Sequence, residues 1–276
     1  MAFFVMRRRF FASTMARPFA EMVSKALAVS DGPACVALTE TEKFAARVLD
    51  ERQASHGFGH ACRVRDLALK IYKEETDADD AKEVEIAALL HDVLDHKYVD
   101  LSTESGRRAR TELDAFLGED SSSILAICET VSYSKEKKAR DKNLPPPYMA
   151  LSSRLQFLRH CVSDADKIDA IGETGLKRCV QYRLEIGTHD DPRAIIDDVA
   201  KHCDEKLLTL LPNYIMTATG RAIAKPHHDY LQCWFDQATN LLNQNDENKD
   251  PYPAGNQKQE KTSFIHNNNS LASSSS

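Results

Sequence analysis

The chain has 276 residues, of which 36 are lysine or arginine and 42 are aspartate or glutamate, so its formal net charge is −6. Its length and its content of 42% hydrophobic and 28% charged residues are those of a globular protein with one large or two small domains. The net acidity argues against binding to a nucleic acid polymer, and no uncharged apolar run approaches the roughly 18 residues of a membrane helix.

The first 35 residues are interpreted as an N-terminal extension. Residues 1–20 contain four arginines among Ser, Thr and Phe residues, and the first acidic residue is Glu21. This composition is typical of an organelle transit peptide, which predicts a mitochondrial location or else a plastid one. The alternative is an unstructured start upstream of a second initiator at Met15 or Met22, in which case we expect a cytoplasmic protein.

Residues 36–242 show a helical pattern throughout and predict one all-α domain. Thr39 and Glu42 have the spacing of a capping box before the first helix. Later helices are predicted where apolar residues recur three and four positions apart, in stripes that include His60 to Ile71, Val84 to Leu94, Ile124 to Val131 and Leu151 to Ala165. Two more helices are expected over residues 193–211 and 213–242, with a break near Pro212.

The segment 243–276 differs from this domain in composition. It is rich in Asn, Ser and Gln and has few apolar residues. Such a segment cannot bury enough apolar surface to offset the entropy of ordering, so the sequence predicts a disordered tail.

Two histidines occupy positions on apolar stripes where leucine is the usual residue. His60 begins the stripe that Val64 continues, and His91 lies one turn after Ala87. Asp92 follows near the end of the same apolar run. Burying this charge unpaired would be costly, so Asp92 needs a metal ion or hydrogen-bond donors.

A group of aspartates follows on a later predicted helix, at positions 164, 166 and 169. Asp166 and Asp169 are three residues apart and therefore share a helix face. Ile168 on the same helix is expected to pack against the core, which puts at least one acid near the core boundary. A solvated acidic face is the alternative for this segment taken alone.

The order of these residues, His60, then His91-Asp92, then Asp166, resembles the H…HD…D pattern of the HD-domain superfamily of metal-dependent phosphohydrolases. The flanking segments are similar to the small stand-alone branch of that superfamily, which is best represented in bacteria; they are residues 55–60, 87–98, 131–134 and 164–172. The resemblance spans about residues 41–240. It implies an HD-domain helical bundle.

The resemblance also implies that one divalent metal ion is bound by His60, His91, Asp92 and Asp166. Imidazole and carboxylate ligands without a thiolate favour Mn²⁺, our first expectation, or Mg²⁺, Fe²⁺, Co²⁺ or Ni²⁺. Such an ion lowers the pKa of bound water and offsets charge that develops on a phosphoryl oxygen.

Further candidate residues flank these ligands. Asp95, one turn after Asp92, and His56 are candidates for orienting water or moving a proton. The candidates for binding substrate are Arg63, Lys97, Lys167 and Tyr133. A polar helix end is the alternative for Asp95, and an ordinary surface charge is the alternative for each basic residue. The adjacent pair His227-His228 lacks the helical spacing of a metal pair and is expected in a loop or at the surface.

The function implied is hydrolysis of a small phosphate ester or anhydride, foremost a nucleotide, with a nucleoside triphosphate cleaved to monophosphate and pyrophosphate. A nucleoside 5′-monophosphatase is the alternative enzyme, and a two-iron oxygenase would need further histidine ligands. A non-catalytic, metal-stabilised helical binding module is the alternative outside enzymes. The expected partner is a small phosphorylated molecule rather than a nucleic acid polymer or a membrane, and the pattern is compatible with any oligomeric state.

Overall fold

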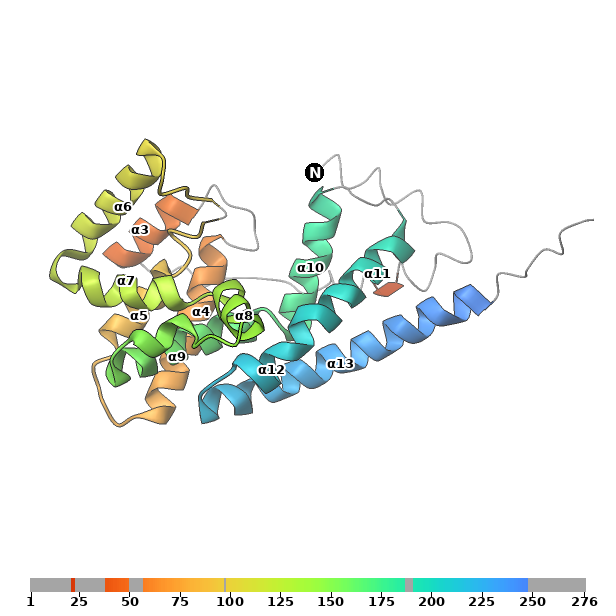
Figure 1. Ribbon diagram of the computed structural model, residues 1–276. Coiled ribbons are helices and arrows are strands. Elements are labelled where there is room, and N and C mark those ends of the chain that lie inside the picture. The colour runs from red at the N-terminus through yellow and green to blue at the C-terminus, as the bar shows by residue number, and fades with distance from the viewer. Residues whose placement is uncertain (1–20, 23–37, 50–56, 97, 187–190, 248–276) are drawn as a thin grey trace, which may run out of the picture.

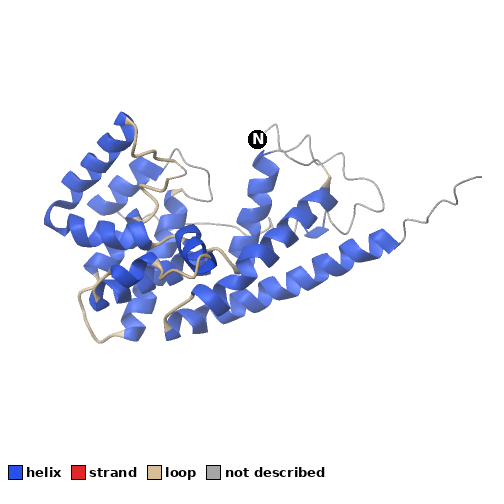
Figure 2. Cartoon of the chain, in the orientation of Figure 1, coloured by secondary structure: helices blue, strands red, loops and turns tan. Residues whose placement is uncertain are grey.

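The computed structural model of the chain describes residues 21–22, 38–49, 57–96, 98–186 and 191–247. All regular structure within these ranges is helical and no strand occurs among them, which confirms the predicted all-α fold (Figure 2). The predicted transit peptide and residues 248–276 of the predicted tail lie outside the described residues, so these two expectations stay predictions.

The first group of helices forms one end of the molecule (Figure 1) and comprises α3 (Glu40–Leu49), α4 (Phe58–Glu75), α5 (Lys82–Leu90), α6 (Glu104–Leu117) and α7 (Ser121–Thr130). The predicted capping box begins α3: the Glu42 amide donates to Thr39 Oγ1 at 3.2 Å, and the Thr39 amide donates to Glu42 Oε2 at 2.7 Å. Helix α6 ends at Leu117 and is followed by Gly118, whose φ of 58° favours glycine.

Helix α5 ends at Leu90, earlier than the predicted stripe, which continued to Leu94. The next residues form turns in which the Val93 amide donates to the Leu90 carbonyl and the Asp95 amide to the Asp92 carbonyl, each at 3.0 Å. His91 and Asp92 therefore lie in a turn at the C-terminal end of α5 rather than within a helix.

The middle of the chain continues with short 3₁₀ helices and two α-helices: η1 (Gly118–Asp120), α8 (Tyr133–Asp141), η2 (Pro147–Ala150) and α9 (Ser153–Asp169). Ser132 caps α8 and Ser152 caps α9, each accepting a bond from the amide three residues later. Helices α6, α8 and α10 were not singled out by the sequence pattern.

The C-terminal helices are α10 (Gly172–Ile186), α11 (Pro192–His202), a π-helical turn η3 (Cys203–Leu207), α12 (Leu208–Tyr214) and α13 (Ala218–Glu247). Pro212 itself lies inside α12, so the break predicted near it comes slightly later in the chain. The chain turns after Tyr214, where the Met216 and Thr217 amides donate to the buried carboxylate of Asp164. Helix α13 also runs five residues past the predicted end at 242.

Helix α4 lies at the centre of the first group and packs along α5 and α9, while α10 and α11 pack on α13, which extends away from that group (Figure 1). The stripe of α4 is buried as predicted, since Val64, Ala68 and Ile71 are fully enclosed and His60 is nearly so. None of the described helices is long and apolar enough to span a lipid bilayer.

Candidate metal centre

Three segments that are distant in sequence bring the four candidate ligands together. His60 comes from the first turn of α4, His91 and Asp92 from the turn after α5, and Asp166 from α9. His60 Nε2 lies 3.7 Å from Asp92 Oδ2 and 3.4 Å from Asp166 Oδ1. His91 Nε2 lies 3.5 Å from Asp92 Oδ1 and 3.9 Å from Asp166 Oδ1. Both imidazole Nε2 atoms therefore face the same two carboxylates.

The tautomer of His91 follows from its backbone contact. Its Nδ1 lies 2.8 Å from the Ala88 carbonyl oxygen, which can only accept a hydrogen bond. The proton of the neutral ring is therefore on Nδ1. The Nε2 atom of His91 is buried and forms no hydrogen bond within the described part of the chain, which is the condition of a lone pair that can bind a metal ion.

The environment of the two imidazoles attracts positive charge. Burial acts to lower the pKa of His60, but the carboxylates of Asp166 and Asp169 raise it above its ordinary value. Burial acts to raise the pKa of Asp166, yet His60 and His91 hold it well below its ordinary range. Asp166 is thus an ionised carboxylate, and its side chain is 31% exposed, so the group is open to solvent on that side.

The donor set fits a divalent metal ion. His60, His91 and Asp92 each offer one ligand atom, and these atoms lie within 4.8 Å of one another. Asp166 Oδ1 lies close to both imidazole Nε2 atoms, as given above. A set of two imidazoles and two carboxylates with no thiolate suits Mn²⁺, Fe²⁺, Co²⁺, Ni²⁺ or Mg²⁺.

The other candidate residues are placed differently from one another. Asp95 lies in the turn after α5, with Oδ1 3.2 Å from His96 Nδ1. The Tyr133 ring stands edge-on to the ring of Tyr214. The Lys206 ammonium lies 5.0 Å from the centroid of the Tyr133 ring. His56 and Lys97 lie outside the described residues. All of these assignments stay predictions.

Two basic residues proposed to bind substrate are engaged with protein carboxylates. Lys167 is buried and donates to Glu136 Oε1 at 2.9 Å. Arg63 Nε donates to Asp169 Oδ1 at 2.7 Å. Their roles toward a substrate stay predictions, but both side chains hold intramolecular partners.

Asp169 and Arg178 are residues at this centre whose roles the sequence did not indicate. His60 Nδ1 lies 2.7 Å from Asp169 Oδ2, and Arg178 from α10 also donates to that oxygen. The spacing of Asp169 from Asp166 was a usable signal for the first residue. Nothing in the local pattern around Arg178 marked it, because its partner lies on another helix.

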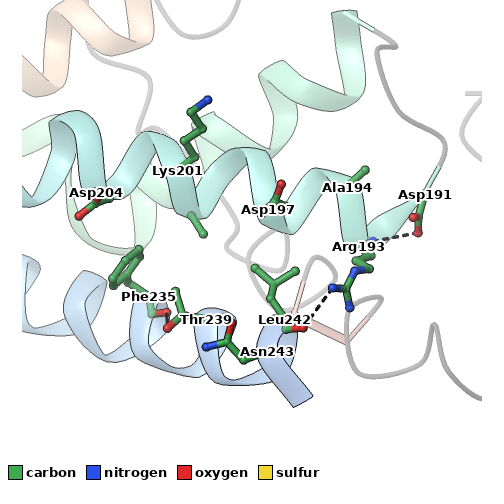
Figure 3. Close-up of a pocket in the computed structure, with 11 residues that line it drawn as sticks. Asp191, Arg193, Ala194, Asp197, Lys201, Asp204, Phe235, Thr239, Leu242 and Asn243 are labelled. Atoms are coloured by element: carbon green, nitrogen blue, oxygen red, sulfur yellow. Dashed lines mark hydrogen bonds between the residues drawn. The ribbon is translucent and has the colours of Figure 1, made fainter. Parts of the chain in front are cut away.

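A groove of about 630 Å³ lies elsewhere, between α11 and α13 (Figure 3). Phe235 and Leu242 lie on its α13 side, and Asp197 and Lys201 on its α11 side. None of the residues that line it is a candidate ligand or substrate residue, so the groove is separate from the metal centre. The pair His227-His228 lies on α13 rather than in a loop, with His227 exposed.

No family model matches the chain. The chain is 29% identical over 189 residues to the protein YpgQ of Bacillus subtilis, an alignment that covers 67% of this chain and 83% of YpgQ.

Solved structures show the same fold. The crystal structure of Bacillus subtilis YpgQ in complex with ADP matches with a TM-score of 0.52 and 24% identity over 73% of this chain and 95% of YpgQ. A Lactobacillus plantarum protein matches with a TM-score of 0.54 and 25% identity, over 75% of this chain and 100% of its own. An HD-superfamily hydrolase of Bacillus thuringiensis matches with a TM-score of 0.50 and 23% identity, over 74% and 95%. The chain thus shares its fold with YpgQ and with an HD-superfamily hydrolase.

Proposed function

We propose that this protein is a metal-dependent phosphohydrolase that acts on a nucleotide. The observation that carries the proposal is the meeting of two imidazoles and two carboxylates, from α4, the turn after α5, and α9, at the distances given above. In the absence of a cation, so many acceptor atoms facing one another at a largely buried place would be unfavourable. A divalent ion satisfies all of them at once.

The ligands proposed are His60, His91, Asp92 and Asp166. A divalent ion bound by them supplies a Lewis acid that stabilises charge on a phosphoryl oxygen and lowers the pKa of water. The protein's own part is to hold both imidazoles as Nδ1–H tautomers and to keep Asp166 ionised. Asp95, on the same turn as Asp92, is proposed to accept a proton from the attacking water or to return it.

The nucleotide part of the proposal is supported by the shared fold with YpgQ, which has been crystallised with ADP. The substrate reaches the centre from the side of Asp166, whose carboxylate is partly exposed. The residues proposed to contact the substrate are those predicted from the sequence, namely Arg63, Lys97, Lys167 and Tyr133. The reaction proposed is cleavage of a nucleoside triphosphate to monophosphate and pyrophosphate.

The test is a panel of nucleoside triphosphates and monophosphates assayed with Mn²⁺, Mg²⁺ or Co²⁺, with pyrophosphate and orthophosphate measured separately. We expect metal-dependent release of pyrophosphate that falls at least about 100-fold in His91→Ala and Asp166→Asn, since loss of a ligand removes the Lewis acid. Asp236→Asn, which changes an exposed carboxylate on α13, is the matched control and should retain full activity.

The other outcomes of this test would indicate a different function. Orthophosphate as the product from monophosphates would identify a nucleoside 5′-monophosphatase. One bound metal ion per chain with no turnover on any substrate would identify a helical binding module. An active His91→Ala variant would refute the metal centre itself.

A further inference from the structure

Asp169 contacts one ring nitrogen of His60, and the candidate ligands lie near the other. Its Oδ2 lies 2.7 Å from His60 Nδ1, whereas Asp92 and Asp166 approach Nε2. Asp169 is only 3% exposed. An ionised carboxylate can only accept a hydrogen bond, and Asp169 Oδ2 lies closer to Nδ1 than Arg178 Nη1 does at 3.3 Å. We therefore assign the Nδ1 proton to the bond with Asp169, which turns Nε2 toward Asp92 and Asp166.

Two arginines hold this same carboxylate from different helices. Arg63, three residues after His60 on α4, donates Nε to Oδ1 at 2.7 Å and Nη2 to Oδ2 at 3.2 Å. Arg178 from α10 donates Nη1 to Oδ2, and the same Nη1 lies 3.3 Å from the Asp169 carbonyl oxygen. Both carboxylate oxygens are thereby engaged, and their charge is offset by two guanidinium groups.

Because both of its carboxylate oxygens are hydrogen-bonded, Asp169 differs from Asp166, although the two lie three residues apart on α9. Asp166 is partly exposed and lies close to both imidazole Nε2 atoms. Asp169 would have to break its bonds to Arg63, Arg178 and His60 before either oxygen could turn toward a metal ion.

We propose that Asp169 is a positioning residue for His60 rather than a metal ligand, and that Arg63 and Arg178 clamp it in this role. The inference rests on the metal centre of the proposed function, but not on the identity of the substrate. It gives Arg63 a place behind the metal centre in addition to the substrate contact expected from the sequence. It also joins α10 to the centre through Arg178.

The first test measures Mn²⁺ affinity by titration of the metal-free protein without substrate. Asp169→Ala is expected to weaken binding about 10- to 100-fold, the usual effect of removing the partner behind a ligand histidine. Asp169→Asn, whose amide oxygen can still accept from Nδ1, should lose less, and it guards against a failure of the alanine variant to fold. Asp66→Asn, an exposed carboxylate on α4 bonded to Arg65, is the matched control and should bind as the unmodified protein does.

The second test reads the His60 ring directly. In metal-free protein labelled with ¹⁵N-histidine and held at alkaline pH, the His60 signals, identified by their loss in His60→Gln, should show the Nδ1–H tautomer. Asp169→Ala should convert them to a mixture of tautomers, while the His91 signals stay unchanged because the Ala88 carbonyl holds that ring.

Two results would overturn the inference. An affinity loss in Asp169→Ala as large as that of Asp166→Asn would identify Asp169 as a ligand, and an unchanged His60 tautomer would remove its positioning role. Neither readout uses turnover, so a protein that binds Mn²⁺ as described but hydrolyses no nucleotide would contradict the proposed function and leave this inference standing.

Discussion

His160 and His202 are two histidines outside the candidate metal centre that are held neutral in the folded protein. Burial lowers the pKa of His160 to about 4, and the neighbouring Arg159 adds to the effect. Burial likewise lowers the pKa of His202 to about 4, with Lys206 acting in the same direction. Both residues are partly buried, so a charge on either ring is less well solvated than in water.

These two histidines predict a loss of stability on acidification. In the unfolded chain both rings take up a proton near their ordinary pKa of about 6.5. Between about pH 6.5 and pH 4 the unfolded chain therefore binds more protons than the folded protein, so their contribution to stability is complete above pH 6.5 and is lost as the pH falls. The urea concentration at the midpoint of unfolding should therefore be lower at about pH 5 than at about pH 7. This decrease should be smaller in the double variant His160→Gln, His202→Gln.

The control is His227→Gln, a change at an exposed histidine. Its urea midpoint should decrease between about pH 7 and about pH 5 by as much as that of the unmodified protein. An equal decrease in the double variant would contradict the prediction that His160 and His202 cause the loss of stability at low pH.

Among the helices, α8 is tied to the bundle by a buried acidic residue. Glu136 is enclosed, and its Oε1 accepts bonds from Lys167 at 2.9 Å and from Arg159, both on α9. Arg159 also donates to the Thr130 carbonyl at the end of α7, and its guanidinium lies 4.4 Å from the centroid of the Tyr148 ring. One carboxylate thus joins α8 to the helix that carries Asp166.

Replacing this carboxylate should destabilise the protein strongly. Glu136→Gln leaves two buried cations without their counter-charge and should lower the free energy of unfolding by about 3 kcal/mol. Asp141→Asn is the matched control on the same helix, because its pair with Lys137 is exposed and its loss should leave the free energy of unfolding nearly unchanged. Equal urea midpoints for the two variants would show that the buried pair contributes no more than a surface pair.

At the scale of the whole molecule, the candidate metal centre joins segments that are 106 residues apart, since Asp166 lies within 4 Å of His60. A metal ion that binds the folded protein and not the unfolded chain stabilises it by about 2.7 kcal/mol when its free concentration is 100 times Kd. Mn²⁺ should therefore raise the thermal unfolding temperature of the metal-free protein.

His91→Ala should abolish this rise, because the variant lacks one of the proposed ligands. The measurement is thermal unfolding with and without Mn²⁺ for both proteins. An equal rise in both would place the bound ion somewhere other than the proposed centre.

The local sequence predicted several of the helices, and the sequence as a whole indicated the candidate metal ligands. The capping box at Thr39 and the stripe from His60 to Ile71 depend on neighbours within one or two turns, so the sequence is enough to predict them. The resemblance to the H…HD…D pattern indicated the candidate ligands His60, His91, Asp92 and Asp166, and in the fold both imidazole Nε2 atoms lie within 4 Å of the two carboxylates.

Only the tertiary structure decided the partners of these residues and the ends of several helices. Arg63 and Lys167 look like phosphate contacts in the sequence, yet in the fold they bond to Asp169 and Glu136. Pro212 is tolerated within α12, and the turn that follows is set by Asp164 from α9. A charged side chain bonds the group that packing brings within about 3 Å of it. For Lys167 and Arg63 that group lies 31 and 106 residues away in sequence, where no local pattern indicates it.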